Sequence, residues 1–298
     1  MCGIVGLHLR QPALYPRLGA LLADMLSQLV DRGPDSAGMA IYGDDIWSPP
    51  GHGTVTLLDS PVAAPALAAE LSTELCVTVT GIDKSPTTVL HAPLDHDILA
   101  TATRSAVPSA RLIGFGSELT VLKGTGNPRA LARSFGLANA RGWQGVGHTR
   151  MATESAVVAA GSHPFSVGPD QCLVHNGSFS NHMSIKHQLE RDGVVFDSEN
   201  DTEVGARFVA KQLAEGADLE KALLALNETF DGFYTLLVST AESFAVLRDA
   251  ISCKPAIIAE TGDWVAMASE YRALANLPGI CDARIFEPEP EQVYVWHR

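Results

Sequence analysis

The strongest indication of the fold is the segment Met1–Leu9, which reads Met-Cys-Gly-Ile-Val-Gly-Leu-His-Leu. Its apolar residues form a short run broken by two glycines, which is typical of a buried strand at the very start of the chain. Cys2 directly follows the initiator Met and is small enough for that Met to be removed. Removal would leave Cys2 as the first residue, with a free α-amino group.

An N-terminal cysteine carries two groups that work together. The thiol is a good nucleophile once it has lost its proton. An α-amino group titrates at about 7.7–8.0 in model peptides, so near neutral pH it can accept that proton. One residue then supplies nucleophile and base, and no histidine partner is required. The alternative is that position 2 simply tolerates cysteine, so Cys2 by itself does not identify an enzyme.

Four further segments lie in a fixed order behind this terminus. They are Arg32–Gly38 (Arg-Gly-Pro-Asp-Ser-Ala-Gly), Gly147–Thr153 (Gly-His-Thr-Arg-Met-Ala-Thr), His175–Gly177 (His-Asn-Gly) and Asn200–Glu203 (Asn-Asp-Thr-Glu). Together with the N-terminal Cys-Gly-Ile, they resemble the class II glutamine amidotransferases, which share the N-terminal-nucleophile hydrolase fold. All five patterns occur in the order of that family, the last with Asn200 where the family has Ser.

The resemblance implies a role for each matching residue. Glutamine presents a carboxylate, an ammonium and a neutral amide, so its site needs a cation, an anion and donors for an oxyanion. The implied catalytic residues are Cys2 as nucleophile, with the Asn176 side chain and the Gly177 backbone N–H as the oxyanion hole. The implied substrate-binding residues are Arg150 for the α-carboxylate, Asp201 for the α-ammonium, Thr153 as a further contact, and Arg32, which we expect to shape the loop around Cys2.

Other polar residues have plainer interpretations. His148 and His175 could serve as bases or metal ligands, but no carboxylate or histidine stands at ligand spacing beside either, so we expect structural roles. Asp95–Asp97 (Asp-His-Asp) resembles a metal-binding tripeptide, yet a helix start explains it better. Lys123–Pro128 lacks the Gly-Lys-Ser/Thr ending of a phosphate loop, which favours a turn. We therefore predict no metal site.

Composition limits the possible partners and the compartment. The 298 residues are 46% hydrophobic and 18% charged, which predicts a globular protein with a substantial core. A net charge of -13 argues against nucleic acid as a partner. No run reaches the roughly 18 apolar residues of a membrane span, and no secretory signal is evident. Five cysteines without a Cys-x-x-Cys pair favour a reducing cytoplasm, with Cys172 and Cys253 expected to be buried and inert.

The pattern of elements indicates the architecture. Many short strand candidates alternate with a few helices, among them Leu14–Val30, Asp201–Ala214 and Leu219–Phe230, which favours packed sheets covered by helices. The resemblance sharpens this to an α+β fold, a four-layer αββα sandwich of the N-terminal-nucleophile hydrolase type. We expect residues 1–298 to form a single amidotransferase domain with an elaborating insertion at about 44–142.

Further resemblances suggest the type of amidotransferase. The segments His148–Val157 and Ser162–Phe165 are similar to the stand-alone amidotransferase subunit of glutamate-synthase-like complexes such as N-methylglutamate synthase. This implies hydrolysis of glutamine to glutamate and ammonia through a Cys2 thioester, with no cofactor in this chain. It also implies partner subunits, a synthase-type FMN subunit and a glycine-repeat β-helix subunit, with FMN and iron–sulfur on those partners.

Three alternatives stay open at this point. The chain could serve another acceptor, such as a phosphoribosyl or sugar substrate. The sugar-forming members carry His-Gly where this sequence has Glu154 and Ser155. It could be another N-terminal-nucleophile hydrolase, although Arg150 and Asp201 as an amino-acid clamp argue against this. It could also be a non-catalytic regulatory subunit.

Overall fold

The computed structural model describes residues 2–151 and 157–298, and within these ranges the strands form three sheets. The large sheet has seven strands in the order β14-β12-β13-β1-β8-β2-β7, all paired antiparallel. Its strands are β1 (Gly3–Leu9), β2 (Ser36–Tyr42), β7 (Leu119–Thr125), β8 (Gln144–Arg150), β12 (Ile257–Glu260), β13 (Trp264–Ala268) and β14 (Arg284–Phe286). The small sheet, β15-β11-β10-β9, consists of β9 (Cys172–Phe179), β10 (Gly232–Ser239), β11 (Ser243–Arg248) and β15 (Tyr294–His297).

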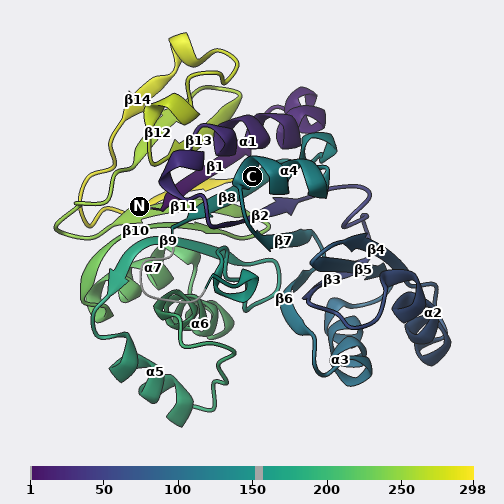
Figure 1. Ribbon diagram of the computed structural model, residues 1–298. Helices are drawn as coiled ribbons and strands as arrows, with labels where there is room; N and C mark the ends of the chain where they lie inside the picture. Colours follow the sequence, from purple (N-terminus) through teal and green to yellow (C-terminus); the bar gives the residue numbers. More distant parts are fainter. Residues whose placement is uncertain (1, 152–156) are drawn as a thin grey trace.

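Helices cover the outer face of each of these two sheets (Figure 1). Over the large sheet lie α1 (Leu18–Ser27) and α4 (Pro128–Phe135). Over the small sheet lie α6 (Asp201–Ala214) and α7 (Leu219–Thr229), and α5 (His182–Arg191) packs against α6. Short 3-10 helices connect the elements at Pro12–Arg17, Val30–Arg32, Leu137–Asn139, Ala159–Gly161, Tyr271–Ala273 and Ile280–Asp282.

Three apolar layers hold this stack together. The α1 side chains, such as Leu22 and Met25, pack on the outer face of the large sheet. Ile4 and Val146 from the large sheet meet Val174 and other small-sheet residues in the layer between the sheets. A third cluster joins the small sheet to α6 and α7. The described chain therefore confirms the predicted αββα sandwich, because two antiparallel sheets face one another between helical layers.

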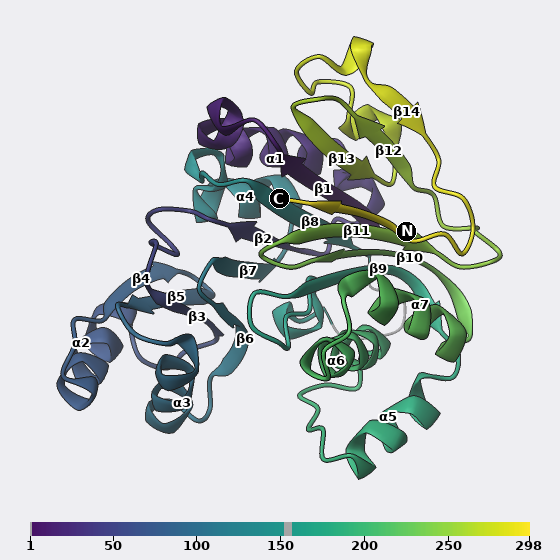
Figure 2. The ribbon, with the colours of Figure 1, turned by 180° about the vertical axis from the view of Figure 1, so that it is seen from behind.

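The third sheet belongs to a separate unit at one side of the sandwich (Figure 2). Its order is β4-β5-β3-β6, with two helices and a core of its own. We call it the insertion unit; it contains β3 (Gly53–Leu58), α2 (Ala64–Leu75), β4 (Thr80–Lys84), β5 (Thr87–Ala92), α3 (His96–Ala106) and β6 (Arg111–Gly116). The stretch of about 44–142 expected as an insertion is wider than this unit. β7 pairs with β2 in the large sheet, and α4 packs against α1.

No helix among the described residues is long and apolar enough to cross a membrane.

The feature that matters most for function is the position of β1 inside the large sheet. It pairs with β13 on one side and β8 on the other, so the start of the chain lies at the end of a central strand.

Candidate active site

A cleft of about 570 Å³ opens beside the start of β1. That volume lies within the range of roughly 300–1,000 Å³ that small-molecule sites occupy. Side chains from both sheets and from the start of α6 line the cleft: Cys2, His148, Arg150, Met151, His163, His175, Asn176, Gly177, Ser178, His182, Glu199, Asn200, Asp201, Thr202 and Lys254. The cleft therefore gathers residues from three of the sequence segments singled out above, together with the chain terminus.

Strand register brings Cys2 to this cleft. Gly3 pairs with Thr149, so one step further along the ladder places Cys2 beside Arg150. A side chain on Gly3 would not fit, because its Cβ would lie 2.8 Å from the Thr149 hydroxyl oxygen. The Cys2 thiol is half-buried and lies 4.0 Å from the carbonyl oxygen of Met151. The nucleophile predicted from the sequence thus lines the cleft.

Arg32 holds the backbone of the terminus in place. Its Nε donates a 2.9 Å hydrogen bond to the Cys2 carbonyl oxygen, and its Nη1 lies 2.7 Å from a carboxylate oxygen of Glu270. The Arg32 side chain is 8% exposed and does not line the cleft. The guanidinium is committed to protein groups beside Cys2, where the sequence analysis expects Arg32 to shape the loop, and it makes no part of the cleft wall.

Asn176 and Gly177 approach Cys2 from the opposing sheet. The Asn176 Nδ2 donates to the Cys2 carbonyl oxygen at 3.2 Å, so its amide lies beside the residue that bears the thiol. Gly177 has φ +145, and a Cβ there would lie 2.0 Å from the Phe233 carbonyl oxygen of the neighbouring strand. Only glycine fits this backbone position. The backbone therefore fixes both residues next to the terminus.

Charged groups of both signs line the same cleft. Arg150 ends β8 with its side chain largely buried, and Lys254 adds a second cation. Asp201 begins α6, where the Asn200 side chain caps the helix by accepting from the Thr202 N–H at 2.9 Å. One Asp201 oxygen accepts from the Phe179 N–H at 2.9 Å. The cleft can therefore hold a molecule that carries both a carboxylate and an ammonium group.

Three buried histidines form one wall of the cleft. The rings of His148 and His163 stack at 4.1 Å between centroids, and His175 stacks on Phe179 at 4.4 Å. The His163 Nδ1 accepts the His175 N–H at 3.2 Å, so its Nε2 carries the proton that it offers to the Thr202 hydroxyl at 3.1 Å.

Burial sets the charge of this wall. It lowers the pKa of His148 to about 3, and it lowers the pKa of His163 and of His175 as well. The three rings are therefore neutral near pH 7. Hydrogen bonds join His163 and His175 to Thr202, whose hydroxyl lies 3.3 Å from Asp201 Oδ1. This matches the structural roles expected for His148 and His175.

Some predicted features fall elsewhere. Thr153 lies outside the described residues. Asp95 caps α3, its side chain accepting from the Asp97 N–H at 2.8 Å, which confirms the expected helix start.

Cys172 is buried, and burial raises the pKa of its thiol to about 12, in keeping with an inert role. The expectation of a buried Cys253 was wrong, because this residue is exposed in the connection that follows β11.

Sequence reasoning missed Lys254, His163 and Thr202 as site residues. The segments that contain His163 and Thr202 resemble known amidotransferases, but the resemblance gave these two side chains no role. Their contribution depends on the sheets meeting across the sandwich, which puts residues far apart in sequence on one cleft. One signal in the sequence was available: Thr202 directly follows Asp201, which the resemblance had already assigned to the site.

Comparison with known proteins agrees with this arrangement. Residues 148–276 match the model of the glutamine amidotransferase domain family. The chain is 44% identical to the glutamine amidotransferase-like protein GlxB of Rhizobium meliloti (strain 1021), over 99% of this chain and 98% of that protein. It is 31% identical to the amidophosphoribosyltransferase of Archaeoglobus fulgidus, over 45% of this chain and 30% of that enzyme.

A solved structure supports the fold. The glutamine phosphoribosylpyrophosphate amidotransferase of B. subtilis superimposes with a TM-score of 0.62 at 20% identity, over 99% of this chain and 47% of that one. The chain thus spans about half the length of that enzyme. At 20% identity this similarity is evidence for the fold alone, and that fold agrees with the αββα sandwich described above.

Proposed function

The chain belongs to the class II glutamine amidotransferase family, and we propose that it hydrolyses glutamine to glutamate and ammonia through a thioester on Cys2. One observation carries this proposal. The Asn176 amide bonds to the Cys2 carbonyl at 3.2 Å in a cleft that also holds Arg150 and Asp201. The groups that would serve as nucleophile, oxyanion donor and amino-acid clamp thus share one cleft, which supports the proposal.

The proposed reaction starts after removal of Met1. The α-amino group of Cys2 takes the thiol proton, and the sulfur attacks the side-chain amide carbon of glutamine. The amide oxygen becomes negatively charged and is stabilised by the Asn176 Nδ2 and the Gly177 N–H. When the carbon–nitrogen bond breaks, the departing nitrogen receives the proton and leaves as ammonia. Water then hydrolyses the thioester, which releases glutamate and restores the thiol.

The same cleft supplies the contacts that would select glutamine. Arg150 would pair with the α-carboxylate, because a planar guanidinium can form two parallel hydrogen bonds to it. Asp201 would accept the α-ammonium through the carboxylate oxygen that does not bond to Phe179. Thr153 would add a further contact, and Lys254 adds positive charge on the same cleft. An amide without these two charged groups would lose much of this binding.

We further propose that the ammonia serves an acceptor enzyme on another chain, in a complex of the glutamate-synthase or N-methylglutamate synthase type. The similarity of His148–Val157 and Ser162–Phe165 to stand-alone subunits of such complexes supports this. The partners would be a synthase-type subunit with FMN and iron–sulfur and a glycine-repeat β-helix subunit. Ammonia would then pass to the flavin site through a channel.

Ammonia release from glutamine tests the first proposal. Wild-type protein without Met1 should release one ammonia per glutamate formed, and Cys2→Ala should abolish this. Cys281→Ala is the matched control, because Cys281 is exposed and does not line the cleft. Ammonia release by Cys2→Ala at the wild-type rate would contradict the thioester mechanism.

Purification of the native complex tests the second proposal. A complex isolated through this chain should show flavin and iron–sulfur absorbance that stays with the other subunits when this chain is removed. In that complex, glutamine should yield product without free ammonia appearing in solution. Equal product yields from glutamine and from added ammonia, with no difference when ammonia is trapped, would contradict channelling.

A further inference from the structure

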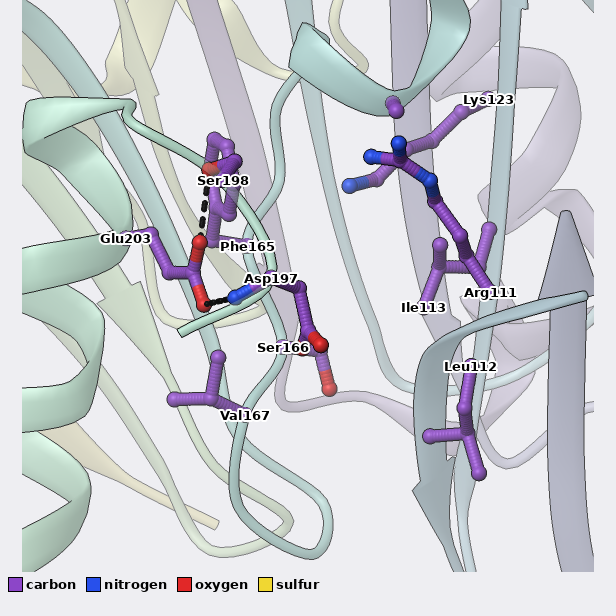
Figure 3. Close-up of a pocket in the computed structure, with 11 residues that line it drawn as sticks. Arg111, Leu112, Ile113, Lys123, Phe165, Ser166, Val167, Asp197, Ser198 and Glu203 are labelled. Carbon is purple, nitrogen blue, oxygen red and sulfur yellow. Dashed lines mark hydrogen bonds between the residues drawn. The ribbon is translucent and has the colours of Figure 1, made fainter. Parts of the chain in front are cut away.

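A second pocket lies where the insertion unit meets the start of α6. Residues of β6, β7, the segment before β9 and the loop before α6 line it: Arg111, Leu112, Ile113, Lys123, Ala160, Phe165, Ser166, Val167, Asp197, Ser198 and Glu203. Its volume is about 40 Å³, room for about three waters or one small anion. In Figure 3 the side chains of Arg111 and Lys123 both extend into this pocket.

Lys123 is an unusual residue to find in this position. Its side chain is 2% exposed, and its Nζ lies 4.7 Å from the centre of the Phe165 ring. Among residues 2–151 and 157–298 it has no hydrogen bond and no carboxylate oxygen within 4.0 Å. A buried cation without a direct counter-ion is destabilising. Lys123 therefore lacks an anion in direct contact in this pocket.

Asp197 and Glu203 also line the pocket, but both pair with Arg207 rather than with Lys123. Asp197 lies 2.7 Å and Glu203 3.0 Å from the Arg207 guanidinium. Glu203 also accepts from the Ser198 hydroxyl at 2.6 Å. In the part of the chain that the structure describes, Arg111 forms no ion pair, so Arg111 and Lys123 are the cations left without an anion.

A hydroxyl group in the same pocket also lacks a good partner. The Ser166 side chain is 7% exposed. Its hydroxyl lies near the Cys172 thiol, and a thiol is a weak hydrogen-bond partner. Apolar side chains, Leu112, Ile113 and Phe165, form the remaining walls. Two cations and one hydroxyl suit the two oxygens of a carboxylate, and the apolar walls suit a short alkyl tail.

We propose that Arg111, Lys123 and Ser166 form a binding site for a small carboxylate anion. The carboxylate bonds to the Lys123 ammonium and the Ser166 hydroxyl, while Arg111 closes the exposed rim. The ligand would also contact Ser198 and Glu203, which flank Asp201 in sequence. Binding would thus order the segment that carries an acid of the glutamine cleft. This inference goes beyond the proposed function and does not depend on it.

Acetate is the probe for this site. Its methyl signal in saturation-transfer NMR, titrated against sodium chloride at constant ionic strength, should show saturable binding to the wild-type protein. Burial lowers the pKa of Lys123 to about 8, so affinity should fall as the pH rises through 8 and the ammonium is lost. The titratable and charged groups around Lys123 are Arg111, Asp197, Glu203, His163 and Cys172.

Lysine variants provide the decisive comparison. Lys123→Met should weaken acetate binding at least tenfold. Lys84→Met is the matched control: the Lys84 ammonium lies 4.8 Å from the Trp47 ring but bonds to the Phe135 carbonyl at 2.7 Å, outside the pocket. If Lys123→Met does not fold, Arg111→Gln at the exposed rim tests the same site and should weaken binding several-fold.

Three results would overturn the proposal. Acetate could show no saturable signal, or equal affinity for the wild type and for a folded Lys123→Met or Arg111→Gln variant. Inorganic phosphate could bind in preference to acetate, which would contradict a site for carboxylates. A loop readout complements these experiments: hydrogen exchange of residues 197–203 should slow with acetate in the wild type and remain unchanged in Lys123→Met.

Discussion

The side-chain amide of Asn176, on β9 of the small sheet, donates a 3.2 Å hydrogen bond to the main-chain carbonyl of Cys2, which directly precedes β1 of the large sheet. Arg32 donates to the same carbonyl oxygen at 2.9 Å. Two donors on one oxygen fix the peptide that follows the nucleophile. The chain terminus is therefore held against the residue that we propose as an oxyanion donor.

Asn176→Ala should lower kcat for glutamine hydrolysis by about 10²–10³-fold, because one oxyanion donor typically contributes about 2.7–4 kcal/mol to the barrier. KM should change little, since the contact strengthens only in the transition state. Steady-state kinetics checks both values. Asn181→Ala is the matched control, because the Asn181 amide bonds to the Thr229 carbonyl at 3.0 Å, outside the cleft. A kcat for Asn176→Ala within twofold of wild type would refute this role.

Arg150→Lys should raise KM for glutamine by roughly 10–100-fold, because a hydrogen bond to a charged group is worth about 1.5–3 kcal/mol and the ammonium cannot pair with two oxygens at once. The same change should hardly affect 4-aminobutanamide, which is glutamine without its α-carboxylate. Arg129→Lys, on an exposed arginine that bonds to the Ser27 carbonyl at 3.1 Å, should leave both substrates unaffected. Equal losses for the two substrates would contradict a carboxylate clamp.

Stability should depend on pH through His148, His163 and His175. Burial lowers the pKa of all three, so the folded protein keeps them neutral while an unfolded chain protonates them below about 6.5. Their contribution is fully present above pH 6.5 and is lost as the pH falls, by about 1.4 kcal/mol per pH unit for each histidine. Urea unfolding between pH 6.5 and 5.5 measures this slope. His148→Phe should reduce it, and an unchanged slope would argue against burial of a neutral His148.

Gly177→Ala should destabilise the fold by about 3 kcal/mol or more, because the added Cβ would lie 2.0 Å from the Phe233 carbonyl oxygen at φ +145. Gly216→Ala provides the comparison: Gly216 has φ +95 with no atom within 4 Å of the added Cβ, so it should cost only about 1–2 kcal/mol. Urea unfolding of both variants gives the two values. Equal losses would show that backbone crowding at Gly177 is not the cause.

Local signals in the sequence predicted several elements with good accuracy. The helix Asp201–Ala214 is found with the predicted bounds, because Asn200 provides a clear N-cap. The sequence also predicts a strand over Leu75–Thr80, which is wrong, since α2 runs to Leu75 and β4 begins at Thr80. β-Branched residues there favoured a strand, but such composition does not locate the end of a helix.

Long-range features could not be predicted in this way. The histidine stack joins His148, His163 and His175, three residues that meet only because β8 and β9 face one another across the sandwich. The pocket around Lys123 likewise needs the insertion unit to lie beside α6. The spacing of residues along a chain does not predict which residues from different sheets come into contact. The position of Cys2 directly after Met1, by contrast, can be read from the sequence.

The proposed role of Cys2 can be tested by incubating the protein with a diazo-ketone analogue of glutamine and measuring the mass of the N-terminal peptide. We predict loss of Met1 and one label on Cys2, which would establish both the processed nucleophile and a working glutamine pocket. A peptide that retains Met1, or a processed Cys2 that stays unlabelled while the label appears elsewhere, would contradict the free-amine mechanism proposed here.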